Sequence, residues 1–176
     1  TLVIDLETGR IVWVGKGRGQ GALRKFWRRL RLSKAKIQAV AMDMSGAYWA
    51  AVLEQLPTAA VVFDRFHIMK LMNEKLDELR RELVREASGV RQQTIKGTRY
   101  LLLTRAAHLA KDQLPKLEEA LKLNEPLSQA YYLKEELGLL WEQPSRAAME
   151  DFLRQWCARA MATGIALLRS TAKTLL

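Results

Sequence analysis

Residues 2–14 carry the pattern of a β-hairpin. Apolar runs at 2–6 and 11–14 flank a short polar segment that contains Gly9. Glycine readily adopts the positive φ that tight hairpin turns need, so its place between two strand-like runs is a strong local signal. The pattern therefore predicts two short antiparallel strands, and the glycine-rich stretch 15–21 that follows predicts a loop.

A short basic helix is predicted next. Its apolar side chains recur at the spacing i, i+3, i+4 and i+7 and form one stripe, Leu23, Phe26, Trp27 and Leu30. That spacing is typical of a helix with one face against a core. Arginine and lysine occupy the other faces, so we expect them to face solvent or a ligand.

Two apolar runs predict strands that a helix connects. Residues 37–42 are apolar apart from Gln38, and residues 59–63 form a second run. Such nearly continuous runs are typical of strands in a parallel sheet with both faces buried. Between them, a helix is expected to begin after Ser45, which can cap it, and to end before Pro57.

The pattern becomes helical from about His67 onwards. The segment 68–83 has one apolar face, and Pro115 is expected to split the segment that contains it. The helices predicted beyond 83 cover residues 99–104, 106–122, 125–141, 145–162 and 164–175. The fold class is therefore α/β plus all-α, with an α/β layer over 1–66 and helices over 67–176.

Composition narrows the class of protein. The 176 residues are 49% hydrophobic and carry 29 Lys+Arg against 19 Asp+Glu, a net charge of +10. Such an excess favours a polyanionic partner, and nucleic acid is the commonest. No apolar run reaches the length of about 18 residues that spans a bilayer, and no signal peptide opens the chain, so we expect no membrane partner and a cytoplasmic protein. One cysteine and two histidines exclude an internal disulfide and a Cys- or His-rich zinc site.

One window contains much of the positive charge. Between Arg10 and Lys36 lie ten basic residues and no acidic one. Phosphate binding driven by counterion release fits such a patch. Trp13 and Trp27 are candidates for stacking on bases, although core positions suit them better. The alternative is a charged face that is only solvated.

Asp43 is the first candidate for chemistry. It follows the apolar run 37–42 directly and precedes a predicted helix. Ligands of open α/β sheets bind at the carboxyl ends of strands, and a carboxylate there can hold a divalent metal for phosphoryl transfer. The alternative is a helix cap next to Ser45, and the pattern alone does not decide between the two.

Asp64 and His67 form the second candidate. They also follow an apolar strand and lie three residues apart. Together they can meet a metal or a phosphate, or they can cap the helix and hydrogen-bond to each other, and the pattern favours the second. Of the remaining candidates, Glu135 and Glu136 fit solvent-facing helix residues in i,i+4 pairs, and Cys157 fits a buried small hydrophobe.

Several segments in a fixed order resemble the transposases of the ISL-three insertion-sequence family, a group of DDE transposases. The resemblance covers essentially the whole chain. It is carried by Ala41–Tyr48 (Ala-Met-Asp-Met-Ser-Gly-Ala-Tyr), Leu56–Ala59, Val62–His67, Asn73–Arg81, Lys96–Leu103 and Ala130–Leu137.

The resemblance implies a partial RNase H-like core, made of the hairpin, a helix and two further strands, followed by a helical insertion. It implies that Asp43 is the second aspartate of an Asp, Asp, Glu metal site, and that Asp64 and His67 form an aspartate-x-x-histidine element. The family's first aspartate and its glutamate have no counterpart in this sequence. Asp5 belongs to the second strand of the core and is not assigned as catalytic.

The resemblance also implies an activity. The parent enzyme would be a bacterial transposase that cleaves DNA and transfers the strand with two Mg²⁺ (or Mn²⁺) ions, binds transposon ends and target DNA, forms a homo-oligomer and associates with the nucleoid. This internal piece is predicted to be inactive alone. The alternatives are a basic DNA-binding module without chemistry and a helical interaction protein. The side chains predicted to contact DNA phosphates are Arg18, Arg24, Lys25, Arg28 and Arg29.

Overall fold

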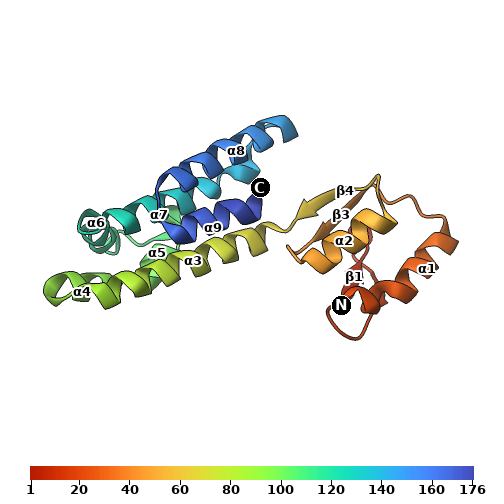
Figure 1. Ribbon diagram of the computed structural model, residues 1–176, viewed down its shortest axis with the longest axis horizontal. Helices are drawn as coiled ribbons and strands as arrows, with labels where there is room; N and C mark the ends of the chain where they lie inside the picture. The colour runs from red at the N-terminus through yellow and green to blue at the C-terminus, as the bar shows by residue number, and fades with distance from the viewer. The chain divides into compact units, whose positions relative to one another are not determined.

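The computed structural model describes all residues, 1–176, and divides into two compact units, Thr1–His67 and Ile68–Leu176. Figure 1 shows strands and helices in the first unit and helices alone in the second. Each unit is described by itself below. None of the helices combines the length and apolarity needed to cross a membrane.

The first unit opens with the predicted hairpin. Strands β1 (Leu2–Ile4) and β2 (Ile11–Val14) pair antiparallel, with Val3 opposite Trp13. Gly9 has φ +68°, the left-handed conformation that the turn requires and that glycine adopts without strain. The hairpin prediction is confirmed.

The basic amphipathic helix is also confirmed. A 3₁₀ turn, η1 (Gln20–Leu23), leads directly into α1 (Arg24–Ser33). Trp27 is buried and Phe26 lies against it, with ring centroids 5.0 Å apart. The helix ends at Lys34, which adopts the left-handed conformation. The apolar stripe thus faces the core, and the cationic side chains of α1 remain exposed.

A parallel pair of strands follows. Strand β3 (Ala39–Met42) pairs with β4 (Ala60–Phe63) in register, and α2 (Gly46–Gln55) connects them. The hairpin and the parallel pair are separate two-stranded sheets and share no strand hydrogen bonds. They share a core in which side chains of both sheets pack against four buried residues, Leu23, Trp27, Ala51 and Val52.

The prediction of strands buried on both faces is wrong. Alternate residues of β3 and β4, such as Val40 and Val61, pack into the core with α1 and α2, but the residues between them are exposed. Val62 is 51% exposed, and Leu2 on β1 is 52% exposed. The reason is that helices of this unit cover only one face of each sheet. The apolar side chains on the other face are therefore exposed in this chain.

The second unit is entirely helical. Helix α3 begins in the first unit and continues into the second, and the turns between the helices are short. In chain order the helices are α3 (Arg65–Glu86), α4 (Gly89–Lys96), α5 (Arg99–Leu103), η2 (Ala106–His108), α6 (Leu114–Lys122), α7 (Glu125–Leu137), η3 (Leu140–Glu142), α8 (Arg146–Ala162) and α9 (Ala166–Leu175).

Helix α7 supplies much of the core of the helical unit. Leu127 and Leu137 are fully buried, and the indole of Trp156 on α8 donates a hydrogen bond of 2.8 Å to the carbonyl oxygen of Leu133. Cys157 is buried, as predicted, and burial raises the pKa of its thiol. Packing on both sides of α7 explains why few of its side chains reach solvent.

Some helix bounds differ from the prediction. The segment 106–122 is split, because Pro115 sits in the first turn of α6 and an irregular stretch separates that helix from η2. The segment 125–141 ends early as a helix, since α7 stops at Leu137 and a 3₁₀ turn follows Gly138. Helix α4 was not predicted, because its short apolar pattern carries little periodic signal.

Candidate active site and nucleic-acid interface

Asp43 and Asp64 lie at the same edge of the parallel pair. The last paired residues of the two strands are Met42 and Phe63, and each aspartate follows directly. The amide of Asp64 donates a hydrogen bond of 3.0 Å to the carbonyl oxygen of Met42. The two aspartates therefore occupy equivalent positions at the carboxyl ends of adjacent strands.

Asp43 has one engaged and one unengaged carboxylate oxygen. Its Oδ1 accepts a hydrogen bond of 3.2 Å from the amide of Ser45. Ser45 occupies the N-cap position of α2, but its own side chain makes no capping hydrogen bond. The local turn is thus shaped by Asp43, and no hydrogen bond or ion pair involves Oδ2. Both interpretations from the sequence, a helix-entry role and a ligand role, are compatible with this geometry.

Asp64 and His67 contact each other. One carboxylate oxygen of Asp64 accepts from the amide of Phe66 at 2.9 Å, and the other lies 2.9 Å from Nδ1 of His67. The Phe66 amide first, and then the His67 contact, lower the pKa of the Asp64 carboxyl below its usual value. Because an ionised carboxylate only accepts hydrogen bonds, Nδ1 carries the proton and Nε2 is the free ring nitrogen of His67.

The carboxylates of this site can be compared with the ligands that hard divalent cations prefer. Such ions prefer carboxylate oxygens, and Oδ2 of Asp43 fits one coordination position. No group of three or more His, Cys, Asp or Glu side chains is arranged to hold a metal ion. Asp5 does not contribute, since its carboxylate accepts from Glu7 and Thr8 within the hairpin turn. At this edge of the parallel pair, Asp43 is the aspartate that keeps one carboxylate oxygen without a hydrogen bond.

Five basic residues of the first unit that were predicted to contact DNA form no ion pair with a carboxylate. Arg18 lies in the loop before η1, and Arg24, Lys25, Arg28 and Arg29 project from the exposed faces of α1. The core contains the aromatic residues instead. The Trp13 indole donates to the carbonyl oxygen of Ala22 at 2.9 Å, and Trp27 is buried. The charges are thus exposed to solvent, whereas the two tryptophans are engaged in the core of the unit.

A shallow groove of about 300 Å³ lies between α1 and α2. Arg24 and Arg31 line it together with Trp27, and Glu54 supplies one acidic side chain. Arg31 donates to the side chain of Gln55 at 2.5 Å, which spans the two helices. The groove adds a concave feature to the basic face of α1.

Glu135 and Glu136 do not form the predicted i,i+4 pairs. Glu135 lies beside the ammonium of Lys134, and its other oxygen accepts from the amide of Ala106 at 3.2 Å. Glu136 pairs with Arg159 on α8. Both are partly buried, because α7 is packed on both sides. Their roles are structural links between helices.

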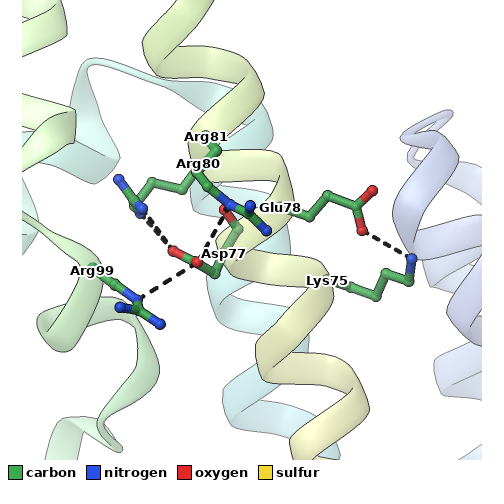
Figure 2. A network of polar contacts seen from close by, with 6 residues as sticks. All are labelled: Lys75, Asp77, Glu78, Arg80, Arg81 and Arg99. Carbon is green, nitrogen blue, oxygen red and sulfur yellow. Dashed lines mark hydrogen bonds and ion pairs between the residues drawn. The ribbon is translucent and has the colours of Figure 1, made fainter.

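A cluster of charged residues in the helical unit was not predicted. Figure 2 shows Arg80, Arg81 and Arg99 converging on Asp77. The spacing of Arg80 and Arg81 from Asp77, i+3 and i+4, could have suggested part of the cluster. Arg99 lies on another helix, so only the tertiary fold brings it to Asp77.

Comparisons with known proteins match the whole chain. A family model described as Transposase, of the ISL3 group of DDE transposases, matches residues 1–176. The chain is 34% identical over 182 residues to the transposase for insertion sequence element IS1001 of Bordetella parapertussis, covering 99% of this chain and 44% of that protein. It is 29% identical over 162 residues to the transposase for insertion sequence element IS1557 of Mycobacterium tuberculosis, covering 78% and 36%. No solved structure matches.

These matches place the chain among the transposases of the DDE type, a class of nucleic-acid-processing enzymes. Within that class, the chain belongs to the ISL3 family. It spans less than half the length of the curated relatives that it matches. The resemblance seen in the sequence is therefore confirmed.

Proposed function

We propose that this chain is part of the catalytic core of a bacterial transposase that cleaves and joins DNA with divalent metal ions. The observation that carries the proposal is the placement of Asp43 and Asp64 at the carboxyl ends of adjacent parallel strands. Ligand sites of open α/β sheets lie at that edge. The identity with the IS1001 transposase, across nearly the whole chain, supports the same function.

Asp43 is the residue proposed to hold metal. Its Oδ1 is fixed by the Ser45 amide, so the carboxylate is oriented before a cation arrives. When bound, two Mg²⁺ or Mn²⁺ ions would activate the attacking oxygen and stabilise the leaving oxygen. Further ligands are proposed to come from other parts of a longer polypeptide, since Asp43 alone holds such ions weakly.

Asp64 and His67 are proposed to act beside that site. Asp64 accepts a hydrogen bond from the Nδ1–H of His67 and so orients the ring, leaving Nε2 to hydrogen-bond with a phosphate oxygen or a water. This role needs no metal bound to either residue. The pair also orders the start of α3 through the Phe66 amide, so a structural role and a functional one coexist.

The exposed cations of the first unit are proposed to bind DNA phosphates. They are Arg18, Arg24, Lys25, Arg28 and Arg29, and no carboxylate neutralises them. Contacts of this kind position a duplex without reading its sequence. Because each contact releases condensed counterions, the affinity is expected to fall steeply with salt.

The architecture proposed for the parent enzyme has two domains. Residues 1–66 form part of an RNase H-like core, and residues 67–176 form a helical insertion. Both two-stranded sheets have unpaired edges, and a further strand of such a core would pair with one edge of each. The parent enzyme is further proposed to form a homo-oligomer, to act at the bacterial nucleoid, and to bind transposon ends and target DNA.

The alternative is a basic DNA-binding module without chemistry. The two are tested with the purified chain and a labelled duplex. We expect salt-sensitive binding and no cleavage in Mg²⁺ or Mn²⁺, because a single strong ligand does not assemble a two-metal site. Replacing Arg28 and Arg29 by glutamine should reduce the slope of log affinity against log salt by about two, roughly 0.9 for each phosphate contact.

The outcomes separate the interpretations. No DNA retention at about 50 mM salt would contradict both and leave a helical interaction protein. Robust cleavage that Asp43→Asn abolishes would show that the chain is active alone, contrary to the proposal. In a longer protein that includes this chain, Asp43→Asn should abolish cleavage and leave DNA binding intact. Normal cleavage by that variant would instead support the module without chemistry.

A further inference from the structure

Asp77 gathers three guanidinium groups in the helical unit. Its Oδ1 accepts a hydrogen bond of 2.9 Å from Nε of Arg80 and forms an ion pair with Nη2 of the same residue at 2.7 Å. Its Oδ2 lies 3.5 Å from Nε of Arg81 and 3.6 Å from Nε of Arg99. Figure 2 shows the three arginines around the one carboxylate. Three positive charges therefore surround one negative charge, and the cluster keeps a net charge of +2.

The three arginines differ in what they expose. The Arg80 side chain is 10% exposed and is satisfied by Asp77, so its role is internal. The Arg81 and Arg99 side chains are 62% and 53% exposed. Each contacts Asp77 through Nε, and more than half of each side chain is exposed to solvent. Because both contact the same oxygen, the two exposed groups are neighbours.

The fold holds Arg99 in this place. Thr98, which precedes it, is fully buried, and its hydroxyl donates to the carbonyl oxygen of Ile95 at 2.6 Å. The Thr98 carbonyl then accepts from the amide of Leu102, which starts α5. Arg99 therefore projects from the first turn of a helix whose entry is fixed. Two segments that are far apart in sequence, 73–81 and 96–103, meet at Asp77 in this way.

We propose that Arg81 and Arg99 form a phosphate-binding pair for the backbone of duplex DNA, with Asp77 as the residue that positions both. Paired guanidinium nitrogens match the geometry of phosphate oxygens and bind them in bidentate fashion. A single positioned carboxylate lowers the entropy lost when the two long side chains bind, yet leaves excess positive charge. The pair extends DNA contact beyond the first unit, and this inference rests on the proposed function in DNA transposition.

The test uses the whole chain and a labelled duplex, with affinity measured by fluorescence anisotropy from about 50 to 200 mM salt. In Arg81→Gln/Arg99→Gln, the slope of log affinity against log salt should fall by about two, since two phosphate contacts are lost. The matched control is Arg146→Gln/Arg154→Gln, which removes the same charge from two exposed arginines of α8 that pair with Glu150. The control should leave the slope nearly unchanged.

Arg81→Lys/Arg99→Lys is a second variant that keeps both charges. It should fold, keep most of the slope and bind DNA several-fold more weakly, because lysine is not bidentate. Thermal unfolding of each variant establishes that it is folded at the assay temperature. The inference is overturned if Arg81→Gln/Arg99→Gln and the control Arg146→Gln/Arg154→Gln change the slope equally. It is also overturned if neither changes the slope while Arg28→Gln/Arg29→Gln does, and DNA binding by the first unit would then stand. An unchanged slope in Arg28→Gln/Arg29→Gln would contradict only the proposal that the first unit binds DNA.

Discussion

Replacing Asp77 by alanine should destabilise the helical unit, because the nearly buried charge of Arg80 would lose its partner. The Asp77 side chain is 14% exposed and that of Arg80 is 10% exposed, so the pair is nearly removed from water. Breaking such a pair leaves an uncompensated charge and typically costs about 3 kcal/mol or more. The long arginine stem allows the charge to move towards solvent, which brings the expected cost below that range, to about 2–3 kcal/mol.

The assay is urea denaturation followed by far-UV circular dichroism. With a denaturant slope of about 1–3 kcal/mol per molar, the midpoint should fall by roughly 1–2 M. The matched control is Glu78→Gln, which breaks a more exposed pair with Lys75 one residue further along α3. It should cost less than about 1 kcal/mol, as surface pairs do.

A double variant identifies the cause. In Asp77→Ala/Arg80→Met, the stranded charge is replaced by an apolar side chain of similar length, so most of the lost stability should return. A value for Asp77→Ala within about 0.5 kcal/mol of the original chain would refute the argument, because surface substitutions fall in that range. Failure of Arg80→Met to restore stability would also refute it, since the loss would then come from another contact.

Three further predictions concern buried or coupled groups. The Tyr131 hydroxyl is buried without a hydrogen-bond partner, and burial raises its pKa to about 12, so Tyr131→Phe should leave stability at pH 8 unchanged or higher. Because the pKa of Tyr131 is raised in the folded state, its contribution to the free energy of unfolding is fully present below pH 10 and is lost as the pH rises towards 12. Between pH 8 and pH 11 the free energy of unfolding of the original chain should therefore fall by about 1 kcal/mol more than that of Tyr131→Phe. An equal fall in both proteins would contradict this. Lys134 is 1% exposed and donates to two carbonyl groups at the end of α5, so Lys134→Met should cost about 2 kcal/mol in urea denaturation, and a neutral effect would contradict this. The Asp64 carboxyl should titrate below its usual value in carbon-13 NMR and rise only partly in His67→Ala, because the Phe66 amide remains; a complete return would show that His67 is the main cause.

The pH sense for Asp64 follows from the direction of the shift. Its folded pKa is lowered, so the stabilisation from its contacts is present above the unfolded value of 3.8 and is lost as the pH falls through the folded value. The Asp64 side chain is 46% exposed, and solvent screening keeps its contribution to stability small. The titration is a test of the hydrogen-bond geometry at the start of α3 rather than of stability.

Local patterns predicted the first unit well. The hairpin followed from Gly9 between two apolar runs, and α1 followed from a stripe of four apolar residues. Each of these two signals comes from residues that lie close to one another along the chain. The placement of Asp43 directly after a strand was also visible, because strand ends are marked by the change from apolar to polar residues.

Long-range contacts were beyond the reach of the pattern. Arg99 meets Asp77 from another helix, and Glu135 meets the amide of Ala106, which lies 29 residues away. Burial was misjudged where it depended on covering elements, as with Val62, whose apolar side chain faces solvent here. The close approach of Arg105 to Gly138, which leaves no room for a side chain there, is likewise a long-range contact that the pattern could not show.

The most direct test of the central claim is metal binding at Asp43. Mn²⁺ added to the nitrogen-15 labelled chain broadens the NMR signals of nearby amides, and this readout needs no catalytic activity. We expect broadening centred on Ser45 and Gly46 that Asp43→Asn abolishes and that Asp5→Asn, which removes an exposed carboxylate elsewhere, leaves intact. Broadening that persists in Asp43→Asn, or that centres on other carboxylates, would contradict the assignment of Asp43 as a metal ligand.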